Sequence, residues 1–123
     1  MATIKLGSAP ATFNKTISFD LVNGEKGEIT FEFVYRTRSE YAALVDELSA
    51  QGKLENFDAS MTEIYKVVDK SAVDFILKAA KGWDLEDKFT PANVAKLVDQ
   101  FPGAFNALTE AYRSALLDGR TKN

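Results

Sequence analysis

The sequence contains neither cysteine nor histidine, and these two absences remove many kinds of enzyme chemistry. Without cysteine no disulfide and no thiolate metal site can form, which suits a reducing compartment. Without histidine the chain lacks the commonest general base and the commonest transition-metal ligand. The two gaps predict a non-enzymatic protein that works by binding and that needs no cofactor and no metal.

Two further classes of protein are disfavoured by features that the chain lacks. No apolar run approaches the ~20 residues of a membrane-spanning helix, and residues 1–5 lack the apolar core of a signal peptide. The formal net charge is -3, so the chain has no excess of basic residues for binding nucleic acid. We therefore expect a cytoplasmic protein with no membrane partner and no nucleic-acid partner.

The composition that is present fits one folded domain. A chain of 123 residues can bury a core, and 46% hydrophobic residues is an ordinary share for a globular protein. No internal repeat or domain boundary is visible, so we expect a single domain over 1–123. Its expected parts are a loosely held lead-in (1–14), a β-hairpin (15–38), a helical part (39–119) and a frayed tail (120–123).

The hairpin is predicted from apolar alternation with a period of two. Ile17, Phe19 and Leu21 share one side of the first strand, and Ile29, Phe31, Phe33 and Tyr35 share one side of the second. Asn23–Gly27 supplies residues that accept positive φ, as a hairpin loop requires. Ile4 and Leu6 are candidates for a short third strand at the edge. Because two strands alone are marginal, we expect the helix with Phe75 and Ile76 to cover the aromatic face.

The first two helices follow from start and stop signals. Ser39 with a carboxylate soon after it is typical of a helix start, and Gly52 is the expected end of that helix. A loop over Leu54–Asp58 leads to Ser60, which forms a capping box with Glu63. The second helix has an apolar stripe at helical spacing over about 20 residues. Its members are Met61, Ile64, Tyr65, Val68, Ala72, Phe75, Ile76 and Ala79, and all are expected in the core.

Two shorter helices are predicted in the last third of the chain. Thr90-Pro91 begins one helix, Pro102-Gly103 separates it from the next, and Gly119 ends the last. The expected apolar faces are Val94, Leu97, Val98 and Phe101, and then Phe105, Leu108, Tyr112, Ala115 and Leu116. The sequence therefore predicts an α+β fold. An N-terminal antiparallel hairpin, with or without the short third strand, packs on a C-terminal bundle of about four helices.

The stretch Lys81–Leu85 lies between the second and third predicted helices. Gly82 is at the expected helix C-cap, and Trp83 is the only tryptophan, so we expect a helix–turn–helix corner held by a buried indole. A binding surface around Trp83 is the alternative. The acids that follow are expected at the start of the next helix, where the dipole favours negative charge: Asp84, Glu86 and Asp87. They lack the spacing of a calcium loop.

Two cations, Arg36 and Arg38, close the predicted hairpin. A solvated strand end and a contact with an acidic partner are both open interpretations of this pair. The chain thus offers one set of candidate structural or partner-contact residues. They are Trp83, Asp84, Leu85, Tyr35, Arg36, Arg38, Phe31 and Phe33.

Several stretches, in this order, resemble the tail assembly chaperones of long non-contractile-tailed phages and prophages. They are Ile4–Phe13, Tyr35–Arg38, Lys81–Leu85, Phe101–Ala104 and Glu110–Tyr112, and together they cover nearly the whole chain. The resemblance implies a non-enzymatic protein of the host bacterial cytoplasm that is absent from the mature virion. It implies binding to the tape measure protein, which stays soluble during tail tube assembly, with the tail tube protein as a further partner. It also implies self-association.

The resemblance further implies that a ribosome slips back one base near the end of such a gene and makes a longer product. Thr121–Asn123 is compatible with the required run of adenines, although several codon choices encode it. Two other functions stay open from the sequence. One is a structural virion component such as a tail completion or head–tail joining protein, and the other is a small acidic regulator of another protein.

Overall fold

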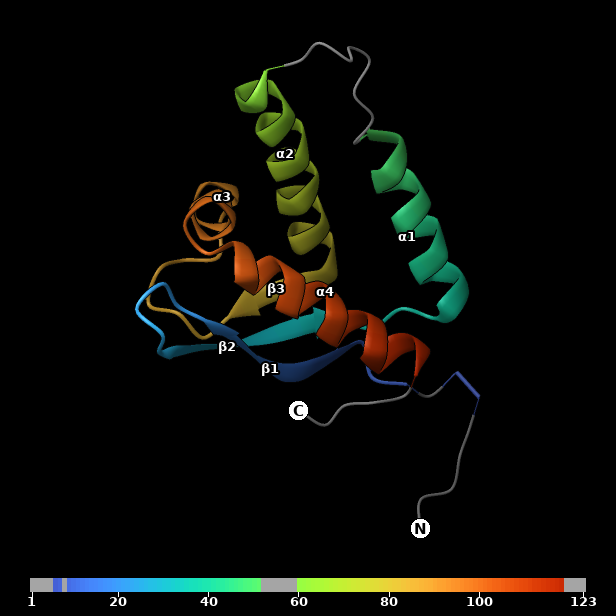
Figure 1. Cartoon of the computed structure of the whole chain (residues 1–123). Coiled ribbons are helices and arrows are strands. Elements are labelled where there is room, and N and C mark those ends of the chain that lie inside the picture. Colours follow the sequence, from blue (N-terminus) through green and yellow to red (C-terminus); the bar gives the residue numbers. More distant parts are fainter. Residues whose placement is uncertain (1–5, 8, 52–59, 119–123) are drawn as a thin grey trace.

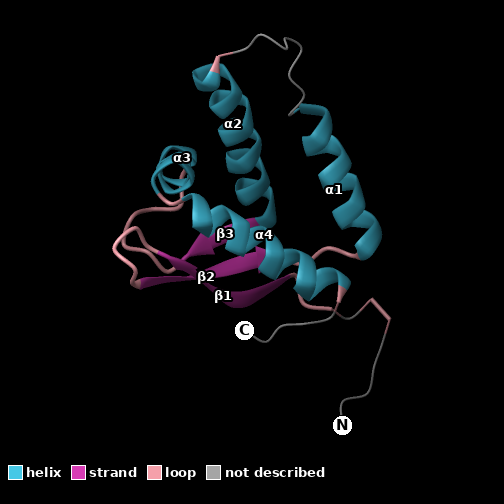
Figure 2. Ribbon diagram, viewed as in Figure 1, coloured by secondary structure: helices cyan, strands magenta, loops and turns pink. Residues whose placement is uncertain are grey.

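The computed structural model describes residues 6, 7, 9–51 and 60–118. They form a three-stranded antiparallel sheet and four helices, which confirms the predicted α+β fold class. The order along the chain is β1–β2–α1–α2–β3–α3–α4. Figures 1 and 2 show the helices gathered on one face of the sheet. The predicted loop before α2, the stops at Gly52 and Gly119, and Thr121–Asn123 lie outside the described residues.

The hairpin forms as the alternation predicts, but it begins earlier. β1 (Thr12–Asp20) pairs with β2 (Lys26–Val34), so the first three residues of β1 belong to the expected lead-in. Gly24 takes a φ of 90° in the turn, a value that suits glycine. Gly27, expected in the loop, instead lies in β2 opposite Phe19.

The third strand is not where the sequence predicts it. β3 (Ala80–Trp83) continues directly from α2 and pairs with β2, with Phe31 opposite Trp83. The expected C-cap and helix–turn–helix corner are therefore wrong, and Gly82 lies in the strand opposite Glu32. Without β3, the N–H and C=O groups along the free edge of β2 would have no hydrogen-bond partners in the sheet. Pairing with β3 supplies those partners. Leu6 lies in a turn, so it forms no edge strand.

The helix α1 (Arg38–Gln51) begins one residue before the predicted Ser39. Its cap is Thr37, whose hydroxyl accepts a hydrogen bond from the Glu40 N–H at 3.2 Å. The Glu40 carboxylate in turn accepts from the Thr37 N–H at 2.9 Å. The Thr37 N–H, and after it the Thr37 side chain, stabilises the Glu40 carboxylate by hydrogen bonding and so holds the pKa of Glu40 below its ordinary value.

The remaining helices start as predicted. They are α2 (Met61–Ala79), α3 (Pro91–Gln100) and α4 (Pro102–Leu117). The Ser60 hydroxyl accepts from the Glu63 N–H at 3.3 Å, and the Thr90 hydroxyl accepts from the Asn93 N–H at 3.2 Å. These bonds satisfy N–H groups that have no partner within the helix, which confirms both N-caps.

Two helices lie directly on the aromatic face of the sheet: α4 packs on β1, and α2 packs on β2, as predicted, and on β3. Tyr112 of α4 is 0% exposed and its ring stacks on Phe33 at 5.1 Å between centroids. Its hydroxyl donates to the Val34 carbonyl oxygen at 2.7 Å, which fixes α4 to β2. Phe75 of α2 meets the edge of the Tyr112 ring at 6.1 Å. The predicted packing of α2 on this face is therefore confirmed, and α4 is a second helix that covers the same face.

Arg36 points inward, although the alternation places it on the outer side. Its Nη1 atom donates to the Lys78 carbonyl oxygen at 2.7 Å and to the Tyr112 hydroxyl at 2.8 Å. The period of two ends with β2 at Val34, so it no longer sets the direction of this side chain. Arg36 therefore joins α2 and α4 to the end of the hairpin.

Candidate functional site

The helix α2 carries an apolar stripe along its whole length, but the core covers only its C-terminal half. The buried members are Ala72, Phe75, Ile76 and Ala79. By contrast Met61, Tyr65 and Val68 are 62%, 56% and 52% exposed. Figure 1 shows the N-terminal half of α2 rising above α3 and α4. The prediction that the whole stripe lies in the core is therefore wrong, because α2, about 28 Å long, extends beyond its neighbours.

A groove of about 730 Å³ lies beside this exposed half of α2, and we call it the α2 groove. Its apolar lining comprises Tyr65, Val68 and Ala72 from α2, Val98 from α3, and Pro102 and Phe105 from α4. Its polar lining comprises Thr62, Lys66, Asp69, Asp99 and Asn106. Neither Asp69 nor Asp99 forms an ion pair with another described residue. A concave apolar surface with a few polar groups is a candidate for binding another molecule.

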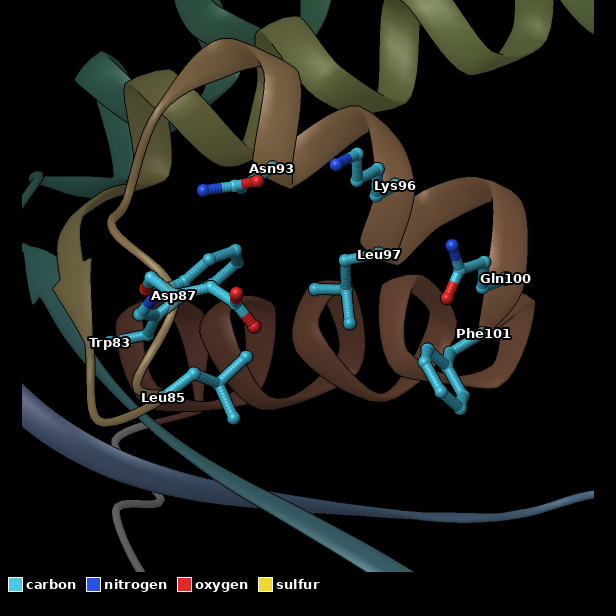
Figure 3. A pocket seen from close by; sticks show the side chains of 8 residues that line it. All are labelled: Trp83, Leu85, Asp87, Asn93, Lys96, Leu97, Gln100 and Phe101. Atoms are coloured by element: carbon cyan, nitrogen blue, oxygen red, sulfur yellow. Dashed lines mark hydrogen bonds between the residues drawn. The ribbon is translucent and has the colours of Figure 1, made fainter.

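A smaller hollow of about 140 Å³ lies between β3 and α3 (Figure 3). Trp83, Leu85, Leu97 and Phe101 supply its apolar lining. Asp87, Asn93, Lys96 and Gln100 supply its polar lining. A space of this size holds no more than one ring-sized group. The hollow can therefore accept a single side chain of a partner, whereas the α2 groove can accept a segment.

Trp83 itself is half-buried and largely engaged within the protein. Its indole N–H donates to the Asp87 carbonyl oxygen at 2.6 Å. Its ring meets Phe89 edge-on at 5.1 Å and Phe31 at 6.1 Å. Trp83 therefore has a structural role at the end of β3, with only part of its surface open.

Asp84 extends the sheet instead of starting a helix. Its carboxylate accepts from the Thr30 N–H at 2.9 Å, and its own N–H donates to the Thr30 carbonyl oxygen at 3.1 Å. The first turn of α3 contains no acidic residue, so the predicted dipole role of these acids is wrong. The chain needs the residues up to Lys88 to pass from β3 to α3, which keeps the acids away from the helix start.

The structure does not bring the eight predicted contact residues into one surface. Phe31 and Phe33 are 0% exposed and belong to the core, against which Leu85 also packs. Tyr35 and Arg38 are exposed and follow the end of β2. The residues that sequence reasoning missed are those of the α2 groove. The length of the apolar stripe could have revealed these residues. One short neighbouring helix cannot cover a stripe that runs the whole length of α2, so part of it had to stay exposed.

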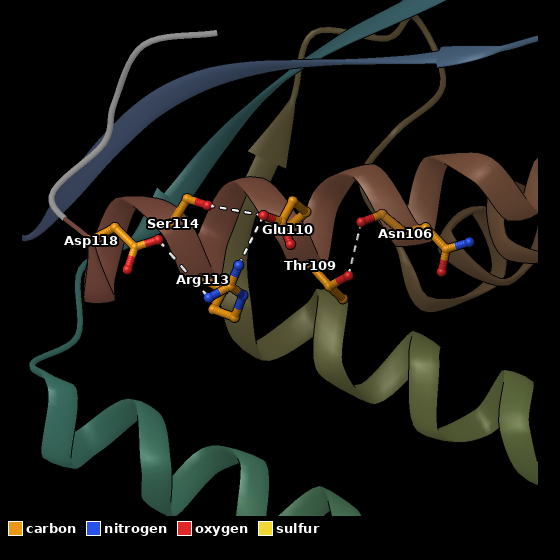
Figure 4. A network of polar contacts seen from close by, with 6 residues as sticks. All are labelled: Asn106, Thr109, Glu110, Arg113, Ser114 and Asp118. Carbon is orange, nitrogen blue, oxygen red and sulfur yellow. Dashed lines mark hydrogen bonds and ion pairs between the residues drawn. The ribbon is translucent and has the colours of Figure 1, made fainter.

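The described residues hold no cluster suited to metal chemistry. No group of three or more histidine, cysteine or acidic side chains in them could hold a metal ion. The polar network on α4 in Figure 4 joins Glu110 to Arg113 at 2.9 Å and to Ser114 at 3.3 Å. These are contacts within one helix, which stabilise the helix slightly. Among the residues that the structure describes, no helix is long and apolar enough to cross a membrane.

A family model described as phage tail assembly chaperone matches residues 1–123, the entire sequence. The chain belongs to the phage tail assembly chaperone family. The match confirms the resemblance to tail assembly chaperones seen in five stretches of the chain. A search of curated proteins and a search of solved structures each found no match. Membership of this family implies protein partners in tail assembly and suggests a role without catalysis.

An exposed apolar helix face is a surface on which a tail assembly chaperone could bind a protein partner. The α2 groove joins such a face to a concave wall built from α3 and α4. A concave apolar surface with few polar groups suits an apolar segment of a partner protein. The groove is therefore the candidate functional site of this tail assembly chaperone.

Proposed function

We propose that this tail assembly chaperone binds the tape measure protein and keeps it soluble while the tail tube assembles. The observation that supports this most is the exposed N-terminal half of the α2 stripe, with Tyr65 and Val68 more than half exposed. A long protein that waits for a tube needs a temporary cover for its apolar helical segments. The α2 groove offers such a cover.

The same proposal includes a set of accompanying properties. The protein acts without catalysis in the host bacterial cytoplasm and leaves before the virion is complete. The tail tube protein is a second partner, and copies of the chain associate with one another. Tyr35, Arg38 and Asp84 are exposed in the structure, so they are available for these secondary contacts.

Co-expression with the cognate tape measure protein tests the main proposal. We expect the soluble yield of the tape measure protein to rise and the two proteins to co-purify at both low and physiological salt. A tape measure protein that stays equally insoluble with and without the chaperone, and is not recovered in pull-downs, contradicts the proposal. Light scattering across a range of concentrations tests self-association, which a strictly monomeric protein would contradict.

The alternative function, a structural virion component, makes a different prediction for purified particles. A chaperone that leaves before completion is missing from them, whereas a tail completion or head–tail joining protein is present in fixed copy number. Mass spectrometry of purified particles distinguishes the two. Membership of the chaperone family favours the first function.

A further inference from the structure

We infer that the α2 groove binds an amphipathic helical segment of the partner protein whose apolar face is flanked by Lys or Arg. This inference rests on the proposed function and assigns a site and a ligand chemistry to it. The apolar lining suits a helical segment with an apolar face. The charged residues of the lining, which we call the charged rim, determine which residues flank that face; they are Asp69, Asp99 and Lys66.

The apolar lining fits a helix that presents side chains at regular spacing. Tyr65, Val68 and Ala72 follow one another at intervals of three and four residues, so they lie along one line on α2. Val98 and Phe105 form the opposite wall. A helix with apolar residues at i, i+3, i+4 and i+7 can lie between these walls and contact both. Ala72 is 3% exposed, so the exposed part of this line of side chains ends before it.

The charged rim favours basic residues beside that apolar face. Asp69 and Asp99 line the groove from α2 and α3, and Lys66 is the one basic residue among the described residues of its lining. Two negative charges and one positive charge leave the groove at -1, and neither carboxylate is paired with a described residue. When a segment displaces water from the groove, a Lys or Arg next to each carboxylate gains an attraction that water would otherwise weaken.

A second copy of the chain is a poorer occupant than a basic partner segment. Two copies that met through this groove would bring its charge of -1 against the same charge, which opposes contact at this face. A symmetric contact would also place one concave groove against another, which leaves the space between them unfilled. The groove therefore fits a convex helix of a different protein.

The first test changes the apolar wall in the full-length chaperone. Val68→Asp places a charge in the groove, and Val45→Asp makes the same change on α1, where Val45 is 36% exposed and outside the groove. Both variants are co-expressed with the cognate tape measure protein, and the affinity of each complex is measured. We expect Val68→Asp to weaken binding at least about tenfold and Val45→Asp to leave it within about twofold. Thermal melts of both variants confirm that they remain folded.

The second test reverses the charge of the rim. Asp69→Lys/Asp99→Lys is compared with Glu28→Lys/Glu32→Lys, which changes the net charge equally at two exposed residues of β2 that alternate with its buried ones. The probes are synthetic peptides of about 20 residues that together cover the tape measure sequence, long enough to form helices on binding. We expect the wild type and the Glu28/Glu32 variant to select amphipathic peptides with Lys or Arg flanks. The Asp69/Asp99 variant should lose these peptides and prefer ones with acidic flanks.

The outcomes separate this inference from the proposed function. If the wild type binds the tape measure protein and Val68→Asp binds it equally well, the groove is not the site and the proposed function stands. If the wild type recovers no tape measure protein, the proposed function fails and this inference fails with it. If Val68→Asp changes only the self-association seen by light scattering, the groove is a contact between copies and the inference is overturned.

Discussion

Removing the hydroxyl of Tyr112 tests how α4 is joined to the sheet. The Tyr112→Phe variant keeps the ring that stacks on Phe33 but loses two hydrogen bonds. One runs from the hydroxyl to the Val34 carbonyl oxygen at 2.7 Å, and the other runs from Arg36 Nη1 to the hydroxyl oxygen at 2.8 Å. The variant therefore isolates the polar contribution of this contact from the packing of the ring.

The expected cost follows from what each partner loses. A buried carbonyl left without its donor loses about 1 kcal/mol, and a hydrogen bond to a charged group is worth about 1.5–3 kcal/mol. Arg36 keeps its bond to the Lys78 carbonyl oxygen and is only half-buried, so the second loss falls at the low end. We expect Tyr112→Phe to lower the free energy of unfolding by about 2.5 kcal/mol. For a domain of this size the melting temperature would fall by roughly 6–10 °C.

Urea and thermal melts of two variants measure this cost. Tyr65→Phe makes the same chemical change at an exposed residue of α2, and we expect it to stay within about 0.5 kcal/mol of the wild type. If Tyr112→Phe also stays within that limit, the two hydrogen bonds do not hold α4 to the sheet and the reasoning is refuted.

The pH dependence gives a second check on the same residue. Burial raises the pKa of the Tyr112 hydroxyl above its ordinary value of about 10, because the interior disfavours the phenolate. The stability that Tyr112 contributes is thus fully present below pH 10 and is lost as the pH rises from there through the folded-state pKa. Phenylalanine cannot titrate, so the stability gap between wild type and Tyr112→Phe should narrow above about pH 10. A gap that widens there contradicts this account.

Three further changes probe other parts of the fold. Trp83→Ala should cost about 3 kcal/mol in urea melts, the low end for a large aromatic because Trp83 is half-buried, and a loss under about 1 kcal/mol contradicts this. Gly27→Ala should cost about 1–2 kcal/mol, because a Cβ there lies 3.1 Å from the Phe19 ring. Gly82→Ala is its control, since a Cβ there meets nothing within 4 Å, and a cost equal to that of Gly27→Ala would refute the argument. Glu40→Ala should lower the melting temperature at neutral pH, where the lowered pKa of Glu40 contributes stability. That difference should shrink as the pH falls from 4.5, the ordinary value, through the lower folded-state pKa. A difference that persists unchanged at acid pH would contradict a role for the Glu40 carboxylate.

The features that could be predicted from the sequence depend on residues close together in the chain. The hairpin follows from alternation within each strand, and the caps at Ser60 and Thr90 depend on hydrogen bonds to the residue three positions on. The strand β3 could not be predicted this way. Its four residues show no alternation, and Asp84 finds its partner Thr30 at a separation of 54 residues. Local propensity gives no information about such a partner.

The candidate site shows a second limit of sequence reasoning. Periodicity shows which face of α2 is apolar, and it treats Val68 and Phe75 alike. Only the packing of α3 and α4 decides that Phe75 is buried and Val68 is exposed. The position of Tyr112 on the apolar face of α4 was likewise predictable, whereas the surface that it covers was not. In this protein the candidate functional surface is the part of the apolar stripe of α2 that α3 and α4 leave exposed.

The long separation between the sheet and α4 has a consequence during synthesis. The bond from Tyr112 to Val34 joins residues 78 positions apart, so the hairpin leaves the ribosome well before the helix that covers it. At about 5–20 residues per second, the rings of Phe31 and Phe33 stay uncovered for roughly 4–16 s. During that interval the newly made chain exposes an aromatic sheet face that neighbouring chains can bind. A protein that we propose to shield an apolar partner therefore first passes through a period in which its own aromatic face is unshielded.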